Sequence, residues 1–185
     1  MADPAEFAVH RHADGTLEDF IVDLPPYFAT WKLAGYRRAG VCLGGPDDNF
    51  LFLISKNGKA GVPYVFIETE DTIDKKLDPR AAALRALKDQ AGIILTVDQL
   101  TTSVRTEVSP TFGVADIFFI VKLDNRVDVN FGTSDLHSGY RWDKVTRTPN
   151  TGEWILAAYK HQVSNEDVRY ISKNVMFLEE KKFLC

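Results

Sequence analysis

Residues 78–92, DPRAAALRALKDQAG, carry the clearest structural signal in this chain of 185 residues. Asp78 is a good N-cap because its carboxylate can accept a hydrogen bond from a free backbone N–H, and Pro79 suits the first helical position. Gly92 is typical of the residue that ends a helix in a left-handed conformation. Apolar residues recur at helical spacing between these ends: Ala81, Leu84, Leu87 and Ala91. The pattern predicts a helix over residues 79–91 that packs through Ala81, Leu84 and Leu87.

The segments before this helix alternate between apolar runs and turn residues. Residues 37–44 and 50–55 are expected to form two buried strands joined by the turn-rich GPDDN, and residues 62–69 are strand-like. Residues 17–24 are also rich in β-formers. They end at Pro25-Pro26, which cannot continue a ladder of hydrogen bonds.

The segments after the helix complete the prediction of an α/β fold. Strands are expected near 101–108, 114–123 and 140–145, and helices at about 152–162 and 165–180. Strands with few helices predict a mixed β-sheet sandwiched between α-helices. The length fits one domain, so we expect a loose N-terminal segment over 1–16 and a single domain over 17–185.

Composition excludes several classes of protein. The net charge of -4 argues against a broad electrostatic grip on nucleic-acid backbone, although a local basic groove stays open. Cys42 and Cys185 have no CxxC partner, which argues against a disulfide framework or a zinc site. No apolar run approaches the ~18 residues of a membrane span, and the N-terminus has no signal-peptide pattern. A cytoplasmic protein without membrane contact is therefore expected.

Residues 85–93, RALKDQAGI, resemble the helical half of the Nudix box, G-x5-E-x7-R-E-U-x-E-E-x-G-U, where U is aliphatic. Asp89 stands where the first glutamate of the E-E pair belongs, and Tyr140-Arg141-Trp142 resembles the strand that often follows the box. The resemblance implies a Nudix-like fold. It also implies metal-assisted hydrolysis of a nucleoside diphosphate joined to another group, with Mg²⁺ or Mn²⁺ as cofactor. Four residues match the pattern's structural positions: Arg85, Leu87, Gly92 and Ile93.

The departures from the pattern bear on function. Ala86 and Gln90 replace two glutamates, Leu77 replaces the upstream glutamate, and Asp71 stands at the glycine position. Of the carboxylates that the pattern supplies, Asp89 alone remains, one methylene short. Mg²⁺ requires several oxygen ligands, so a single aspartate would hold it poorly. The degenerate box therefore predicts a catalytically impaired domain, a pseudoenzyme.

A small set of residues is left as candidates for the site. Asp89 is the residual catalytic candidate, but it is also placed to pair with Arg85 four residues away. Metal ligands, if the protein binds an ion, would be Asp89 with Glu70 and Asp71, although these acids also suit a solvated loop. Candidate ligand-binding residues are Lys56, Tyr64 and Trp142, each with an ordinary structural role as the alternative. The four histidines form no ligand spacing.

Two functions of different class follow from these residues. The favoured one is a binding module for a nucleotide-like small molecule, an RNA end or a protein partner, with a homodimer left open. The alternative is a weak or altered divalent-metal-dependent hydrolase of nucleoside diphosphate-X compounds, with Mg²⁺ or Mn²⁺. A third reading, some other α/β domain, would make the box match accidental.

Overall fold

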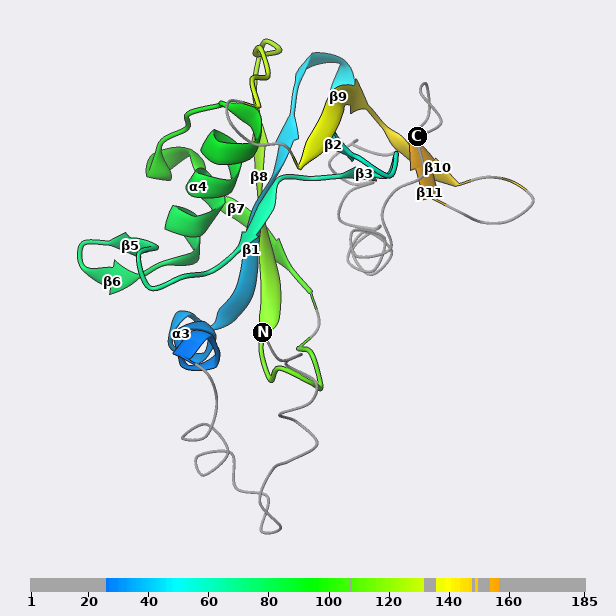
Figure 1. Cartoon of the computed structure of the whole chain (residues 1–185). Coiled ribbons are helices and arrows are strands. Elements are labelled where there is room, and N and C mark those ends of the chain that lie inside the picture. The colour runs from blue at the N-terminus through cyan, green and yellow to red at the C-terminus, as the bar shows by residue number, and fades with distance from the viewer. Residues whose placement is uncertain (1–25, 107, 132–135, 148, 150–153, 157–185) are drawn as a thin grey trace.

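The centre of the molecule is a mixed β-sheet (Figure 1), seen in a computed structural model that describes residues 26–106, 108–131, 136–147, 149 and 154–156. β1 and β8 run parallel, and the other strand pairs of this sheet are antiparallel. β4 (Tyr64–Phe66) pairs with β1, and β9 (His137–Asp143) pairs with β2. The main path of paired strands is β3 (Ala60–Gly61), β2 (Phe50–Ser55), β1 (Tyr36–Gly44), β8 (Ala115–Lys122) and β7 (Thr102–Arg105).

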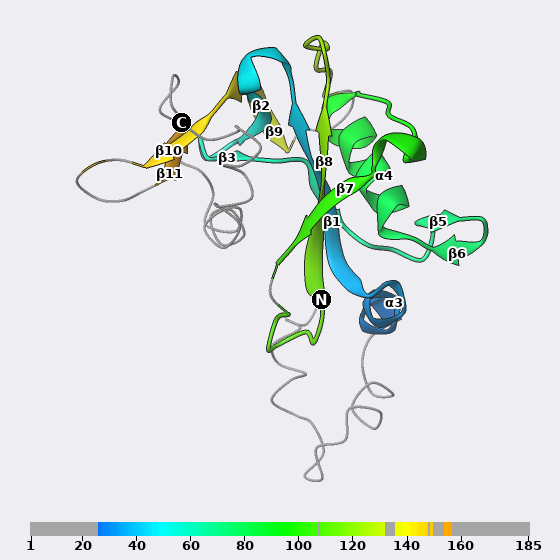
Figure 2. The same cartoon turned by 180° about the vertical axis from the view of Figure 1, so that it is seen from behind.

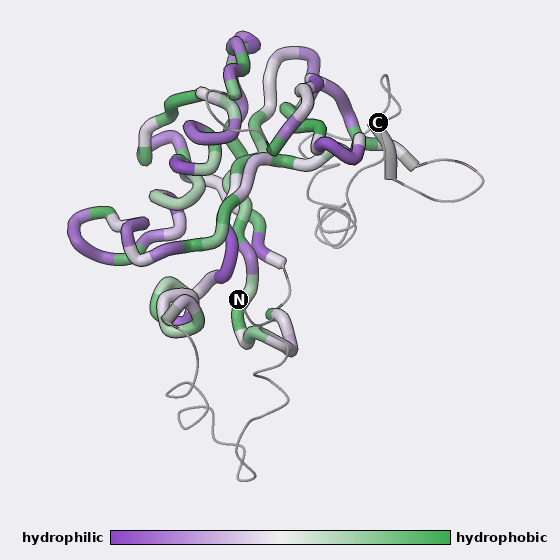
Figure 3. Tube along the Cα trace, viewed as in Figure 1, coloured by the Kyte–Doolittle hydropathy of each residue, from purple (hydrophilic) through white to green (hydrophobic). Residues whose placement is uncertain are grey.

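Two small hairpins project from this sheet. β5 (Thr72–Ile73) pairs with β6 (Lys76–Leu77), and β10 (Val145–Arg147) pairs with β11 (Trp154–Leu156). The view from behind shows α4 (Pro79–Ala91) and the β10–β11 hairpin on opposite sides of the central strands (Figure 2). The β5–β6 arm is mostly hydrophilic, in contrast to the central strands (Figure 3). Short 3-10 turns occupy Pro46–Asp48 and Val97–Gln99.

The α4 helix has the bounds that the sequence predicts. The Asp78 carboxylate accepts a hydrogen bond from the backbone N–H of Arg80 at 2.9 Å, as an N-cap does. Gly92 adopts φ 67°, and its N–H donates to the carbonyl of Lys88 at 3.0 Å. Both ends of the helix are therefore fixed by the local signals that predict them.

The buried face of α4 is wider than the sequence pattern predicts and is turned relative to it. Leu87 is fully buried as expected, but Ala81 and Leu84 are only half-buried. The helix packs against both β1 and β4, so a second row of its residues is also buried. The buried residues are Ala82, Ala83, Ala86, Leu87, Gln90 and Ala91.

Both faces of the sheet are buried, because side chains of successive strand residues point in opposite directions. On β8, Ile117 and Phe119 join the core that packs against α4, while Phe118 faces the second core. On β2, Leu51 likewise faces α4 and Phe52 faces the opposite side. The near-continuous apolar strands 37–44, 50–55 and 114–123 are confirmed: β1 begins one residue earlier, β2 has the predicted bounds, and β8 is one residue shorter at each end.

Helix α3 (Pro26–Ala34) is not among the predicted elements. It starts at a proline and is followed by Gly35 at φ 79°, the same kind of boundary signals that identify α4. Its side chains Phe28 and Trp31 are buried in the hydrophobic core on the α4 side of the sheet. The strand predicted at 17–24 lies outside the described residues.

The helix predicted at 152–162 is wrong where it can be compared. Trp154–Leu156 is strand β11, with Ile155 opposite Thr146 in antiparallel register with β10. Pairing of backbone groups between strands replaces the local helical preference there. The helix predicted at 165–180 lies outside the described residues. None of the described helices is long and apolar enough to cross a membrane.

The end of α4 gives a first testable prediction, Gly92→Ala. An added Cβ would lie 2.5 Å from the carbonyl oxygen of Asn130, at a φ that side chains rarely adopt. We expect a loss of about 2–3 kcal/mol in the free energy of unfolding, measured by urea denaturation. Gly58→Ala is the control, because its φ of 82° is similar but no atom lies within 4 Å. Equal losses in the two variants would contradict the close packing of Asn130 on this helix end.

Candidate functional site

A cleft of about 650 Å³ opens beside α4, between β4, the β2–β3 turn and the start of β9. Its walls combine apolar side chains with a few polar groups, the usual composition of a small-molecule site. Arg85 and Gln90 reach it from α4, and Glu68 from the segment after β4. The lining residues are Leu53, Ser55, Asn57, Lys59, Gly61, Val62, Tyr64, Val65, Phe66, Glu68, Arg85, Gln90, Leu136 and His137.

Arg85 is held at the cleft by a bidentate ion pair with Asp71. Its Nε donates to Oδ1 and its Nη2 to Oδ2 of Asp71, both at 2.9 Å, and Nη2 also donates to the Phe66 carbonyl. Asp71 is 3% exposed and also accepts from the backbone N–H of Glu68 at 2.8 Å. The hydrogen bonds that Arg85 donates to Asp71 raise the pKa of Arg85. This pair ties α4 to the loop between β4 and β5.

Arg85 and Asp89, which the sequence pattern predicts to form a pair, are not hydrogen-bonded partners in the structure. The expected partner of Arg85 is Asp89, but the hydrogen-bonded partner is Asp71, fourteen residues earlier in the chain. Asp89 is exposed and does not line the cleft. A sequence separation of four allows a pair on a helix, but the bidentate contact with a buried carboxylate is the stronger interaction.

The described carboxylates do not fit a Mg²⁺ or Mn²⁺ site. Glu68 is the one acid among the described cleft residues, and its Oε2 lies 3.9 Å from Nη2 of Arg85. Both oxygens of Asp71 already accept hydrogen bonds from Arg85, and Glu70 is exposed outside the cleft. Within the described ranges no group of three metal-binding side chains lies together. A hard divalent ion needs several oxygen ligands, and this donor set does not supply them.

Gln90 has a structural contact that a glutamate could not make. Its Nε2 donates to the carbonyl of Tyr64 at 2.8 Å, and the side chain is buried between α4 and β4. A carboxylate in its ionised form has no hydrogen to donate. The amide at this position of the box therefore joins the helix to the strand. Tyr64 lines the cleft as a candidate ligand-binding residue, with the guanidinium of Arg38 4.8 Å from its ring centroid.

The turn between β2 and β3 brings a different lysine to the cleft from the one predicted. Lys56 lies in this turn but is exposed outside the lining, whereas Lys59 lines the cleft. The Ser55 hydroxyl accepts from the Lys59 N–H at 3.2 Å and donates to the Lys59 carbonyl at 3.0 Å. Asn57 also accepts from the Lys59 N–H. These hydrogen bonds within the turn fix the position of the Lys59 backbone.

His137 and Phe66 are cleft residues that the sequence analysis does not single out. His137 begins β9 opposite Ser55, and its buried Nδ1 has no hydrogen-bond partner among the described residues. Burial lowers the pKa of His137. Phe66 is 49% exposed and stacks on Trp31, with ring centroids 5.7 Å apart. Neither residue has a local sequence signal, because long-range strand pairing brings both to the cleft.

Trp142 is not among the residues that line this cleft. It stands on β9 opposite Leu51 and lines a second hollow with Arg126 and Tyr140. The predicted ligand-binding residues are therefore divided: Tyr64 lines the first cleft, Trp142 the second hollow, and Lys56 neither.

Comparison with known proteins identifies the fold. No family sequence profile and no curated protein sequence matches the chain. A MutT/nudix family protein from Enterococcus faecalis superposes with a TM-score of 0.53 at 14% identity, covering 97% of this chain and 76% of that one. The Nudix hydrolase RenU from M. smegmatis superposes with a TM-score of 0.52 at 17% identity, covering 78% and 86%. Together with the mixed sheet and the capped α4 helix, these similarities show that the chain has the Nudix fold.

Proposed function

We propose that this chain is a catalytically impaired Nudix-like module that binds a phosphate-bearing, nucleotide-like ligand in the α4 cleft without a divalent ion. The observation that carries the proposal is the composition of the cleft. One carboxylate, Glu68, stands among its described lining residues, alongside the cations Lys59 and Arg85. Because Arg85 is already paired with Asp71, Lys59 is the cation among the described lining residues that an anion can pair with.

The groups around the cleft suit the parts of a nucleotide. Lys59 supplies an ammonium for a phosphate, and the buried Nδ1 of His137 adds a site for a polar contact. Phe66 presents a half-exposed ring that is held from behind by Trp31, as a stacking surface for a base requires. The remaining walls, such as Leu53 and Val62, are apolar and exclude water from these contacts.

Hydrolysis in the manner that the fold family implies needs several carboxylates on one metal. Ala86 is fully buried, and Gln90 uses its amide to hold Tyr64. Positions 86 and 90, where the box pattern has glutamates, therefore contribute to the packing of α4 against the sheet. This supports binding without turnover, while the alternative, a weak metal-dependent hydrolase, becomes one outcome of the test.

Calorimetry with ADP-ribose, once with EDTA and once with Mg²⁺, tests the proposal on the full chain. We expect the same affinity in both titrations and no release of AMP or phosphate on long incubation. Binding that occurs only with Mg²⁺, accompanied by a hydrolysis product, would contradict the proposal and support the weak hydrolase. Absence of ADP-ribose binding under both conditions would remove the nucleotide part of the proposal.

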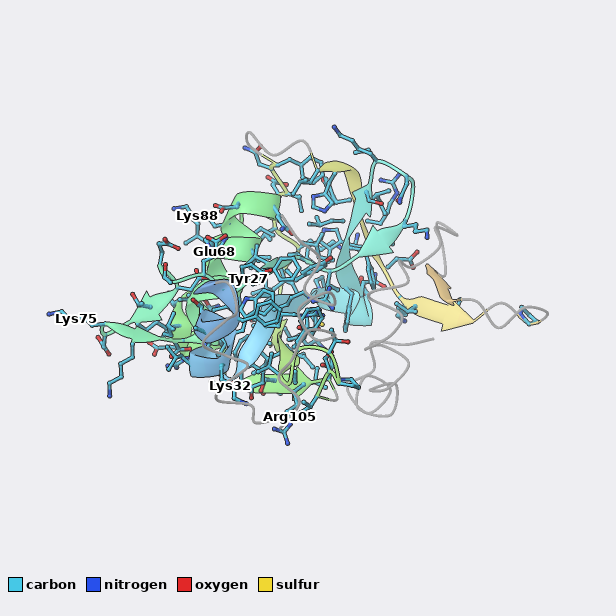
Figure 4. All side chains as sticks on the ribbon, turned by 60° about the horizontal axis from the view of Figure 1, so that its bottom comes forward. Tyr27, Lys32, Glu68, Lys75, Lys88 and Arg105 are labelled. Carbon is cyan, nitrogen blue, oxygen red and sulfur yellow. The ribbon has the colours of Figure 1, made fainter. Side chains whose placement is uncertain are left out.

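The contribution of Lys59 gives a second prediction, Lys59→Ala. We expect ADP-ribose to bind about 10- to 100-fold more weakly, because a charge-assisted hydrogen bond to the ligand is lost. Lys75→Ala is the matched control: this lysine lies at the outer end of the β5–β6 arm, while Glu68 lies beside α4 (Figure 4). Equal weakening in both variants would indicate a nonspecific charge effect and would count against the α4 cleft as the site.

A further inference from the structure

A second hollow of about 700 Å³ lies between β9 and the segment that follows β8. Among its described lining residues are three aromatic side chains, two arginines and one acid, Asp128. The nucleotide cleft proposed above uses none of these side chains. The lining residues are Arg126, Val127, Asp128, Phe131, Ser138, Gly139, Tyr140, Arg141 and Trp142.

The aromatic side chains of this hollow are fixed and partly open. The Phe131 and Tyr140 rings meet edge to face, with centroids 6.2 Å apart at 73°. Trp142 packs closely over Gly45, where an added Cβ would lie 3.1 Å from the indole ring. Tyr140 remains 37% exposed. A ring that is held at its edge but open on its surface is suited to stack on a base.

The charges of the hollow favour an anion. Arg126 is exposed and, in the part of the chain that the structure describes, forms no ion pair. Arg141 donates from Nη1 to the Tyr140 carbonyl at 2.7 Å, which holds its guanidinium along β9. Guanidinium groups bind phosphate oxygens through paired N–H donors. Aromatic rings and arginines together are the groups that bind single-stranded nucleic acid.

The two hollows adjoin along β9. His137 lines the first and Ser138, the next residue, lines the second. Phe131 lines the second hollow, and its ring centroid lies 6.2 Å from both the His137 ring of the first and the Tyr140 ring of the second. A linear ligand that crosses Phe131 can therefore occupy both hollows.

We infer that the second hollow binds a second nucleotide unit, with its base on Tyr140 and its phosphate near Arg126. The first unit of the same ligand occupies the α4 cleft, so this inference rests on the proposed function. The ligand class is two nucleotides joined by a phosphodiester, as at the 5′ end of a single strand. The chain's net charge of -4 does not oppose this, because the recognition is local and relies on stacking.

The test compares AMP with the 5′-phosphorylated dinucleotide pApA by calorimetry on the full chain in EDTA. We expect pApA to bind about 5- to 150-fold more tightly than AMP, the gain from stacking one further base. Tyr140→Ala should abolish this gain and leave AMP affinity unchanged, while Tyr140→Phe should keep it because the ring remains. Melting curves of each variant verify that it is folded.

Arg126→Ala should weaken pApA but not AMP, and Arg105→Ala is its control, an exposed arginine at the end of β7 (Figure 4). Equal affinities of AMP and pApA for the wild-type protein would overturn the second hollow as a site and leave the first cleft standing. A gain that survives Tyr140→Ala would also overturn it. If neither AMP nor pApA binds, the proposed function fails and this inference with it.

Discussion

Asp116→Asn is expected to lower the free energy of unfolding by about 3–5 kcal/mol, the usual result of removing one partner from a buried ion pair. Asp116 is 2% exposed on β8, and Arg37 and Arg38 at the start of β1 both point at it. Asparagine keeps the shape of the side chain but removes its charge. Two buried guanidinium groups would then lose the charged carboxylate that both of them bind.

The geometry explains why the loss should be large. The Asp116 carboxylate accepts from Nε and Nη2 of Arg37 at 3.2 and 3.0 Å. It also accepts from Nε, Nη2 and the backbone N–H of Arg38 at 3.1, 2.8 and 3.1 Å. The Arg37 guanidinium lies 4.3 Å from the Phe112 ring centroid and so has little access to water. This one carboxylate therefore binds both guanidinium groups.

Urea denaturation of wild type, Asp116→Asn and Asp124→Asn measures this effect. Asp124 is exposed just after β8, so its variant should stay within about 0.5 kcal/mol of wild type. If Asp116→Asn costs no more than Asp124→Asn, the cluster does not stabilise the fold.

The same carboxylate makes stability depend on pH in a defined direction. Burial alone would raise the pKa of Asp116, but hydrogen bonds from Arg37 and Arg38 outweigh it and hold this pKa below its usual value. A depressed pKa contributes stability that is fully present above the unfolded value of about 3.9 and is lost as pH falls through the folded pKa. The difference between wild type and Asp116→Asn should therefore shrink below about pH 4. A constant difference down to pH 2 would contradict this.

The elements that could be predicted from sequence are those whose signals are local. α4 begins and ends as predicted because Asp78, Pro79 and Gly92 act on the backbone next to them. The buried strands β1, β2 and β8 follow from apolar runs that only a doubly covered sheet accommodates.

The site itself could be predicted only in part, because distant segments build it. Arg85 belongs to the matched box, but its partner Asp71 comes from the loop after β4, whose position the sequence does not show. His137 reaches the cleft only through the pairing of β9 with β2, which no local pattern specifies. The buried face of α4 also depends on β4 packing beside β1, so no local pattern shows that Ala86 is fully enclosed.

Putting a glutamate back at Ala86 should therefore destabilise the protein rather than restore a metal site. Ala86→Glu inserts a larger side chain into a closed space, at a cost of about 1–3 kcal/mol. The carboxylate must also lose its water or take up a proton. For a carboxyl whose ordinary pKa is about 4.3, protonation at pH 7 adds up to about 3–4 kcal/mol. The total expected loss is about 4–7 kcal/mol.

Ala81→Glu is the matched control for this last prediction. It makes the same substitution on the same helix, but at a half-buried position in the first turn, where a negative charge is favourable. Its free energy of unfolding should stay within about 0.5 kcal/mol of wild type. Mg²⁺ should not raise the melting temperature of Ala86→Glu, even with Gln90→Glu added, because the second change also breaks the hydrogen bond to the Tyr64 carbonyl. A clear rise with Mg²⁺ would mean that this face of α4 can open towards the cleft and collect an ion. Metal binding would then have been lost through the side chains at positions 86 and 90 alone. That result would support the weak-hydrolase alternative, which the packing of Ala86 argues against.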